Sequence, residues 1–289
     1  MRFEDKLAAA QQRNRSWLCI GLDIDVAKLP LSVQQTDDPL LTFARAIVDA
    51  TQDLVCAYKP NLGFFLAEGA AGISALERLI RYIPSDIPII LDGKFSDIGS
   101  TAGQYARGAF QALGVDAVTL SPYVGADAIQ PFLAFADKGV FVLARTSNPG
   151  SGQFQNLMVE CEPEGAAGSA LHAPRSALYE VVVCEAAQWH RQGPGACGLV
   201  VGATYPHELE RIRLLAPDLP FLVPGVGAQG GDLAAAVRHG PSSSGVGPVV
   251  NASRSVLYAS SREDFAEAAR TVAVQVRQEI NELRAASRA

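Results

Sequence analysis

Short apolar runs recur along the chain, and each is followed by a polar or glycine-containing turn and then by a longer amphipathic stretch. Most of these short runs are almost continuously apolar, which is typical of parallel strands that are buried on both faces of a sheet. We expect eight such strands, at residues 17–23, 54–59, 87–94, 115–120, 140–145, 198–203, 220–224 and 247–251.

The stretches between the strands repeat their apolar residues with helical spacing, as Leu41, Ala44 and Val48 do in the first of them. We expect helices at residues 40–52, 68–82, 101–113, 126–136, 168–191, 207–215, 232–238 and 263–286. Eight strands that alternate with helices, about 36 residues apart (289/8), predict an α/β protein with the (β/α)8 TIM-barrel architecture. A doubly wound parallel sheet is the alternative architecture.

Three segments stand outside this alternation. Residues 1–16 predict an additional helix that closes the bottom of the barrel. Residues 146–167 follow the fifth strand without a clear period, and long irregular segments in compact domains are usually functional, so this segment is a candidate active-site loop. Residues 285–289 are expected to fray. No linker divides the chain, so we expect one domain over residues 1–289.

Composition excludes several classes of protein. Apolar residues make up 48% of the chain and charged residues 19%, which is typical of a globular protein, and the net charge of −6 argues against general nucleic-acid binding. No apolar run is long enough for a membrane span and no secretory signal is visible, so we expect a cytoplasmic protein. The five cysteines form no CxxC pair and the four histidines are scattered, so we expect no metal site.

Charged residues stand where the predicted strands end, which is where barrel enzymes carry their functional groups. Asp23, Lys59 and the Asp92–Lys94 pair end three of the strands, although the chain has only five lysines against 19 arginines. Asp92 and Lys94 are two residues apart and therefore face the same side of a strand, with Asp97 in the turn beyond. Two carboxylates beside one ammonium keep it protonated, which suits proton delivery to a carbanion and not Schiff-base chemistry. An N-cap of the next helix is the alternative role for Asp97.

A second group of residues predicts a phosphate site near the last two strands. Glycines at positions 225, 227 and 230 leave backbone N–H groups accessible, and Arg254 follows the eighth strand. An arginine can hold a phosphate with two parallel hydrogen bonds, whereas a surface ion pair is the alternative role for Arg254. The same loop spells GxGxxG, but the acidic residue that a dinucleotide site needs about 20 positions later is missing.

The segment Asp92-Gly93-Lys94-Phe95-Ser96-Asp97-Ile98-Gly99-Ser100-Thr101 resembles the DxKxxDIxxT signature of the orotidine 5′-phosphate decarboxylase family. The long bacterial subgroup of that family is the more similar one. Segments typical of that subgroup occur in this order along the chain: LCIGLD, YKPNLGFF, TSNPGS, VGATYP, VPGVGAQGGD and VNASR. The resemblance extends over residues 3–258, which is almost the whole chain.

The resemblance implies a cofactor-free TIM barrel that acts as a homodimer and converts orotidine 5′-phosphate to UMP and CO₂, the last step of de novo pyrimidine biosynthesis. It implies that Lys94 protonates C6, that Asp92 holds Lys94 and crowds the substrate carboxylate, and that Asp97 completes the charged array. The residues implied to bind the substrate are Asp23 and Lys59 at the ribose, Ser147 at the pyrimidine, Gln229 and Arg254 at the phosphate, and Thr101, which with Asp97 reaches the neighbouring subunit's site.

Two other functions remain open at this point. One is a sister enzyme, a Mg²⁺-dependent sugar-phosphate decarboxylase or hexulose-phosphate synthase, because such enzymes share the barrel and the DxKxxD array. The other is a nucleotide-binding barrel without catalytic activity. Ser147 and the TSNPGS segment argue against the first, and the intact Asp92, Lys94 and Asp97 argue against the second.

Overall fold

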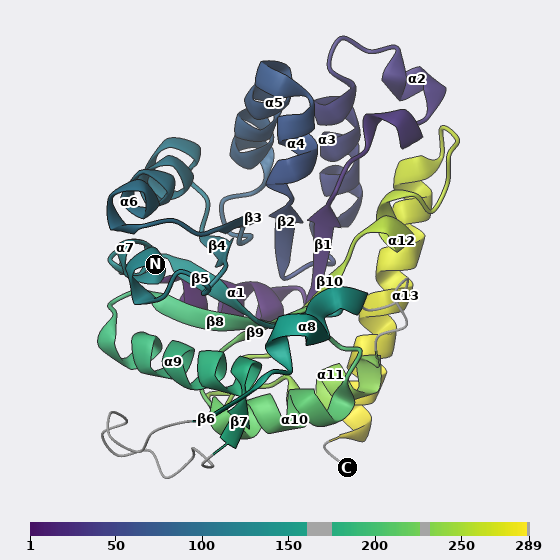
Figure 1. The fold of residues 1–289 in the computed structure, drawn as a ribbon. Coiled ribbons are helices and arrows are strands. Elements are labelled where there is room, and N and C mark those ends of the chain that lie inside the picture. The colour runs from purple at the N-terminus through teal and green to yellow at the C-terminus, as the bar shows by residue number, and fades with distance from the viewer. Residues whose placement is uncertain (161–174, 226–231, 288–289) are drawn as a thin grey trace.

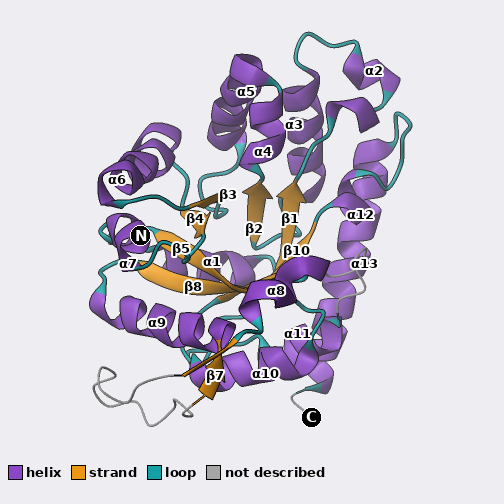
Figure 2. Cartoon of the chain, viewed as in Figure 1, coloured by secondary structure: helices purple, strands orange, loops and turns teal. Residues whose placement is uncertain are grey.

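A parallel eight-stranded barrel surrounded by helices forms the body of the protein in a computed structural model, which describes residues 1–160, 175–225 and 232–287 (Figures 1 and 2). The strands follow the order β2-β1-β10-β9-β8-β5-β4-β3, and parallel bridges from Tyr58 to Ile89 and from Asn61 to Asp92 close β2 onto β3. The barrel strands are β1 (Leu18–Leu22), β2 (Ala57–Pro60), β3 (Ile90–Phe95), β4 (Ala117–Leu120), β5 (Gly139–Arg145), β8 (Ala196–Val201), β9 (Phe221–Pro224) and β10 (Val249–Ala252). The TIM-barrel prediction and all eight predicted strands are confirmed, with boundaries shifted by a few residues.

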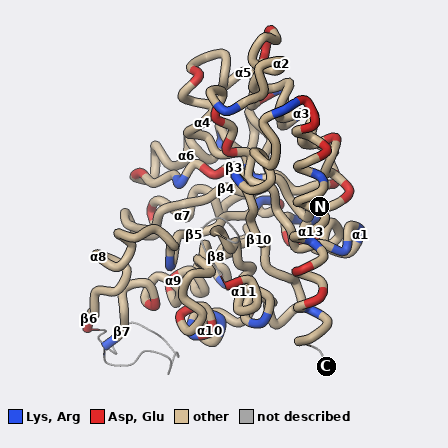
Figure 3. Tube along the Cα trace, turned by 90° about the vertical axis from the view of Figure 1, so that its right-hand side faces the viewer, with Lys and Arg blue, Asp and Glu red and all other residues tan. Residues whose placement is uncertain are grey.

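Helices cover the outside of the barrel, where they bury one apolar face each. The longer ones are α3 (Pro39–Thr51), α5 (Gly69–Tyr82), α6 (Gly99–Arg107), α7 (Ala126–Leu133), α9 (Leu178–Gln192), α10 (Pro206–Leu215), α11 (Leu233–His239) and α13 (Phe265–Ala286). Short helices lie in the connections: α2 (Leu31–Gln34), α4 (Leu62–Ala67), α8 (Gly152–Gln155) and α12 (Arg254–Leu257). Within the described residues, no helix is both long and apolar enough to cross a bilayer. Figure 3 shows acidic and basic positions interspersed over these outer helices.

The N-terminal ends of the strands are covered by helix α1 (Phe3–Arg13). Phe3 and Leu7 are buried against the first residues of the strands, and the Phe3 ring packs edge-on against Phe141 with 5.8 Å between ring centroids. Lys6 adds an ion pair at this end, with 2.7 Å between its Nζ and Oδ2 of Asp116. A mostly apolar plug therefore fills this end of the barrel.

Two predictions fail in the connection after β5. The helix expected at 168–191 begins only at Leu178, because residues 175–177 form β7 (Arg175–Ala177), which pairs antiparallel with β6 (Met158–Glu160). The Glu180 carboxylate accepts the Ala177 backbone N–H at 3.0 Å and thereby fixes the helix start. The segment 146–160 is also not irregular, since it contains a 3-10 turn (Pro149–Ser151), α8 and β6, while residues 161–174 lie outside the described part.

The last helix ends at the residue predicted for it, inside the segment that was expected to fray. Helix α13 reaches Ala286, and the backbone N–H of Ser287 donates to the carbonyl of Leu283, because the alanines at 285 and 286 favour helix. The segment predicted to fray thus begins inside a helix, and residues 288–289 lie outside the described part.

Candidate active site

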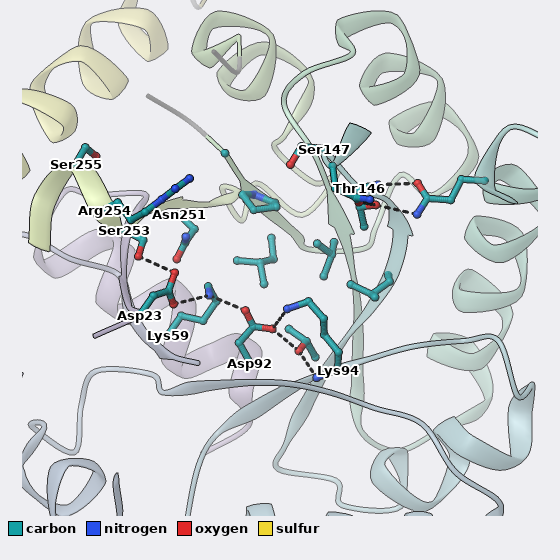
Figure 4. A pocket seen from close by; sticks show the side chains of 18 residues that line it. Asp23, Lys59, Asp92, Lys94, Thr146, Ser147, Asn251, Ser253, Arg254 and Ser255 are labelled. Carbon is teal, nitrogen blue, oxygen red and sulfur yellow. Dashed lines mark hydrogen bonds and ion pairs between the residues drawn. The ribbon is translucent and has the colours of Figure 1, made fainter. Parts of the chain in front are cut away.

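A cavity of about 510 Å³ opens at the C-terminal end of the barrel, opposite the end covered by α1 (Figure 4). Its size lies in the range of small-molecule sites. Figure 4 shows the charged side chains of Asp23, Lys59, Asp92 and Lys94 along one side, with Thr146 and Ser147 opposite and Arg254 at the edge. Apolar side chains complete the lining, contributed by Leu143, Val200, Leu222 and Pro224.

The four charged residues form a chain of alternating sign across β1, β2 and β3. Lys59 Nζ lies 3.8 Å from Asp23 Oδ1 and 2.8 Å from Asp92 Oδ2. Lys94 Nζ lies 2.6 Å from the other carboxylate oxygen of Asp92, Oδ1. Strands β1 and β2 end in register, with Leu22 opposite Pro60, which brings these groups to one level of the barrel.

Asp92 is the centre of this chain and is almost fully buried. Besides the two lysines, its carboxylate accepts a hydrogen bond from the Thr119 hydroxyl at 2.8 Å and a longer one from the Asn61 amide at 3.4 Å. Burial alone would raise the pKa of the Asp92 carboxyl, but the charges and hydrogen bonds of Lys59 and Lys94 outweigh burial and hold that pKa well below its usual range. Asp92 is therefore an anion at any physiological pH.

Lys59 is as deeply buried as Asp92, whereas Lys94 is not. Burial lowers the pKa of the Lys59 ammonium, but the charges of Asp92 and Asp23 more than compensate, so the net shift of this pKa is upward. Lys59 is thus a fixed cation. The Lys94 side chain is 49% exposed, with its ammonium at the cavity. Both lysines line the cavity, and Lys94 is the more exposed of the two.

The backbone at Lys94 is unusual, since its φ of 47° lies in the left-handed region that non-glycine residues rarely adopt. The pairing of β3 with β4 shifts there: Leu91 pairs with Val118, and the next paired residue on β3 is Phe95, opposite Leu120. The extra residues form a bulge, which re-aims side chains at the end of a strand. Asp92 and Lys94 both line the cavity and form an ion pair, although the strand between them is not regular.

Two buried oxygen atoms near Asp23 accept no hydrogen bond from the described residues. The Ser253 hydroxyl lies 2.7 Å from Asp23 Oδ2, and the Tyr258 hydroxyl donates to the Asp23 backbone carbonyl at 3.0 Å. Asp23 Oδ1 and the side-chain oxygen of Asn251 are buried and have no hydrogen-bond partner among the described residues. Nearly all buried polar atoms in proteins have a hydrogen-bond partner, and a ligand with hydroxyl groups would supply a donor to these two acceptors.

The opposite wall is built from the segment after β5. The Gln155 amide bonds both ways to Thr146, accepting from its backbone N–H at 2.9 Å and donating to its hydroxyl at 2.8 Å. Arg145, buried at the end of β5, donates to Glu208 at 2.6 Å and to the Thr146 carbonyl at 3.1 Å. Ser147 follows Thr146 directly in the chain and lines the cavity.

Six predicted site residues are brought together around this cavity, namely Asp23, Lys59, Asp92, Lys94, Ser147 and Arg254. Gln229 lies outside the described residues. Asp97 and Thr101 do not line the cavity: the Asp97 carboxylate accepts the neighbouring Ile98 N–H at 2.8 Å, and Thr101 is exposed on α6. Among the described residues Lys94 forms an ion pair with Asp92 and none with Asp97, so the bracketing of Lys94 by two carboxylates stays a prediction.

Other polar residues of the lining were not predicted as site residues, and these are Thr119, Thr146, Asn148, Gln155, Asn251, Ser253 and Ser255. Thr119 is the one polar residue in the run AVTL, and this was the available signal in the sequence. Within the described part of the chain, no three His, Cys, Asp or Glu side chains come together as metal ligands. The acidic groups of the cavity are instead paired with lysines.

Comparisons with known proteins agree on one family. Residues 16–270 match the sequence model of the Orotidine 5'-phosphate decarboxylase / HUMPS family. A relative from Cupriavidus necator named orotidine 5'-phosphate decarboxylase is 49% identical over 98% of this chain and 99% of its own, and one of the same name from Thermomicrobium roseum is 47% identical over 98% and 96%. The solved structure of Leishmania donovani OMP decarboxylase is similar with a TM-score of 0.79 and 37% identity, over 98% of this chain and 99% of that one.

Proposed function

Because the chain belongs to the orotidine 5′-phosphate decarboxylase / HUMPS family, we propose that it is an orotidine 5′-phosphate decarboxylase, which forms UMP and CO₂ in pyrimidine biosynthesis. The observation that carries this proposal is the alternating chain of Asp23, Lys59, Asp92 and Lys94 on one wall of the cavity. The family description also covers HUMPS proteins. This reaction is favoured because relatives named orotidine 5'-phosphate decarboxylase are 49% identical over almost the full length of the chain.

In the proposed reaction, the bond between C6 of the pyrimidine and its carboxylate carbon breaks, and the electron pair stays on C6 while CO₂ departs. The Lys94 ammonium stabilises this negative charge and donates a proton to C6, which yields UMP. The resulting neutral amine takes a proton back from water. Asp92 holds Lys94 in place and lies where the substrate carboxylate is crowded and repelled, which favours loss of CO₂.

The remaining cavity residues are proposed to bind the rest of the substrate. Asp23 and Lys59 bind the ribose hydroxyls, and one hydroxyl donates a hydrogen bond to Asp23 Oδ1. Ser147 bonds the amide edge of the pyrimidine, and Arg254 holds the phosphate together with Gln229. The phosphate lies far from the reacting carbon, so its binding energy can be used to exclude water from the charged wall.

We further propose that the enzyme acts as a homodimer in which Asp97 and Thr101 serve the neighbouring site. Neither residue lines the cavity of its own chain, and apolar side chains are exposed at α6, where Ile98 at the N-cap is 62% and Tyr105 within the helix is 44% exposed. A mixture of inactive Lys94→Ala and inactive Asp97→Ala proteins tests this arrangement, because only mixed dimers contain one site with both residues. Full subunit exchange should restore about a quarter of wild-type activity; no recovery after demonstrated exchange would contradict a shared site.

The reaction itself is tested by the ultraviolet absorbance of orotidine 5′-phosphate with purified enzyme in excess EDTA, since loss of the carboxylate changes the pyrimidine chromophore. The proposal predicts turnover in EDTA. Turnover of sugar phosphates that requires added Mg²⁺ would instead identify a sister enzyme of the same family. Binding of UMP without any turnover would identify a barrel that only binds nucleotides.

A further inference from the structure

A buried threonine on β4 connects the two catalytic groups that β3 carries. Thr119 is 1% exposed and stands in an apolar strand, where a hydroxyl is costly unless it is hydrogen-bonded. Its hydroxyl donates to Asp92 Oδ1 at 2.8 Å and accepts the backbone N–H of Lys94 at 3.0 Å. Both capacities of this one hydroxyl are therefore used on the Asp92–Lys94 pair.

The hydrogen bond from the Lys94 backbone N–H to the Thr119 hydroxyl takes the place of a ladder hydrogen bond that the bulge interrupts. Between the paired residues Leu91 and Phe95, the backbone of β3 leaves its regular pairing with β4. The Lys94 N–H would be left without its partner in the ladder, and the left-handed backbone at this residue is itself unfavourable. The Thr119 side chain accepts this N–H and so stabilises the conformation that turns the lysine toward the cavity.

The hydrogen bond from the Thr119 hydroxyl to Asp92 acts on the ammonium end of Lys94 through the carboxylate that both groups share. Asp92 Oδ1 receives both the Lys94 ammonium, at 2.6 Å, and the Thr119 hydroxyl. Backbone N–H, threonine oxygen, carboxylate and ammonium thus form a closed ring that holds Lys94 at both ends. The Lys94 side chain is half exposed and has several rotatable bonds, so without this ring it would be free to sample other directions.

We propose that Thr119 is a positioning residue for the decarboxylation, acting through Lys94 and Asp92 and not by contact with the substrate's reacting atoms. This inference rests on the proposed function. It assigns a function to the bulge in β3: the irregular backbone aims the ammonium, and the threonine on the neighbouring strand maintains that aim.

The test compares Thr119→Val, which keeps the shape and removes the hydroxyl, with Thr119→Ser, which keeps the hydroxyl. Small displacements of a catalytic group cost about 100-fold, so we expect kcat of Thr119→Val to fall about 100-fold while KM changes less than about threefold. Thr119→Ser should restore kcat to within about fivefold of wild type, because the donor and the acceptor are both present again. Thr119→Ala takes the place of Thr119→Val if the valine variant does not fold.

Thr51→Val is the matched control. Thr51 is also fully buried, and its hydroxyl bonds the Ile47 carbonyl at 2.6 Å and lies 2.7 Å from the Tyr58 hydroxyl, but it does not line the cavity. This variant should lose stability and keep wild-type kcat. Wild-type kcat in Thr119→Val, or an equal loss in the valine and serine variants, would overturn the positioning role. A wild-type enzyme without turnover would refute the proposed function instead.

Discussion

The two ends of the barrel are built from the same eight strands and have opposite character. At the N-terminal end, Phe3 and Leu7 fill the barrel among apolar side chains, and Lys6 and Asp116 form an ion pair at its edge. At the C-terminal end, two carboxylates and two ammonium groups share one wall of an open cavity. The proposed chemistry therefore lies at one end of the strands, and the apolar plug lies at the other.

The difference between the two ends is tested most directly by replacing one aspartate with asparagine at each end. Asp92→Asn removes the charge between Lys59 and Lys94, leaving a buried ammonium with only the more distant Asp23. We expect kcat/KM to fall by at least about 1000-fold and the free energy of unfolding to fall by about 3 kcal/mol. Steady-state kinetics and denaturant titration measure the two effects.

Asp116→Asn is the matched change at the other end. Asp116 bonds Lys6 Nζ at 2.7 Å and the Ile89 backbone N–H at 2.8 Å, and an asparagine oxygen can still accept the latter. We expect a loss of about 1 kcal/mol in stability and unchanged kcat/KM. A comparable loss of activity in both variants would show that the two ends are not functionally separate.

The apolar plug is tested by Phe3→Ala. Phe3 is 2% exposed and packs on Phe141, so its removal leaves a cavity at the bottom of the barrel. We expect the free energy of unfolding to fall by about 3 kcal/mol or more, with kcat per folded molecule unchanged. Chemical denaturation with activity measured at low denaturant checks both parts, and a specific loss of kcat would mean that α1 supports the site.

Acid pH should act on the charged end with a smaller effect. The pKa of Asp92 is depressed in the folded protein, so its contribution to stability is fully present above the unfolded value of about 3.9 and is lost as the pH falls toward the folded value. Unfolding curves between pH 5 and 3 should therefore show wild type losing more stability than Asp92→Asn, by about 1 kcal/mol or more. Parallel curves for the two proteins would contradict the depressed pKa.

The eight strands and part of the charged cavity could be predicted from the sequence, whereas the local geometry of the cavity could not. Strands buried on both faces appear as continuous apolar runs, so all eight were recognisable, and charged residues at their ends marked Asp92 and Lys94. The signal for Thr119, a single polar residue in the run AVTL, did not identify it as a site residue, because threonine is equally typical of an ordinary strand. The bulge at Lys94 was also not predictable, since it depends on the register of β3 against β4.

The helix start at Leu178 and the place of Asp97 show a second limit. Local propensity favoured a helix from 168, but residues 175–177 pair with β6, a partner that periodicity does not reveal. Asp97 belongs to the sequence motif of Asp92 and Lys94, yet it does not line the cavity with them, and its carboxylate accepts the Ile98 N–H. Sequence proximity indicated a common function for these residues, but it did not indicate that Asp97 lies outside the cavity of its own chain.

The central claim is that the charged end acts through the Lys94 ammonium, and Lys94→Ala tests it most directly. Turnover of orotidine 5′-phosphate in EDTA is compared between this variant and wild type at equal concentrations of folded protein. The account predicts a loss of about 100- to 10,000-fold or more in kcat, with the denaturation midpoint little changed because Lys94 is half exposed. Retention of activity within tenfold of wild type, in a variant shown to be folded, would contradict it.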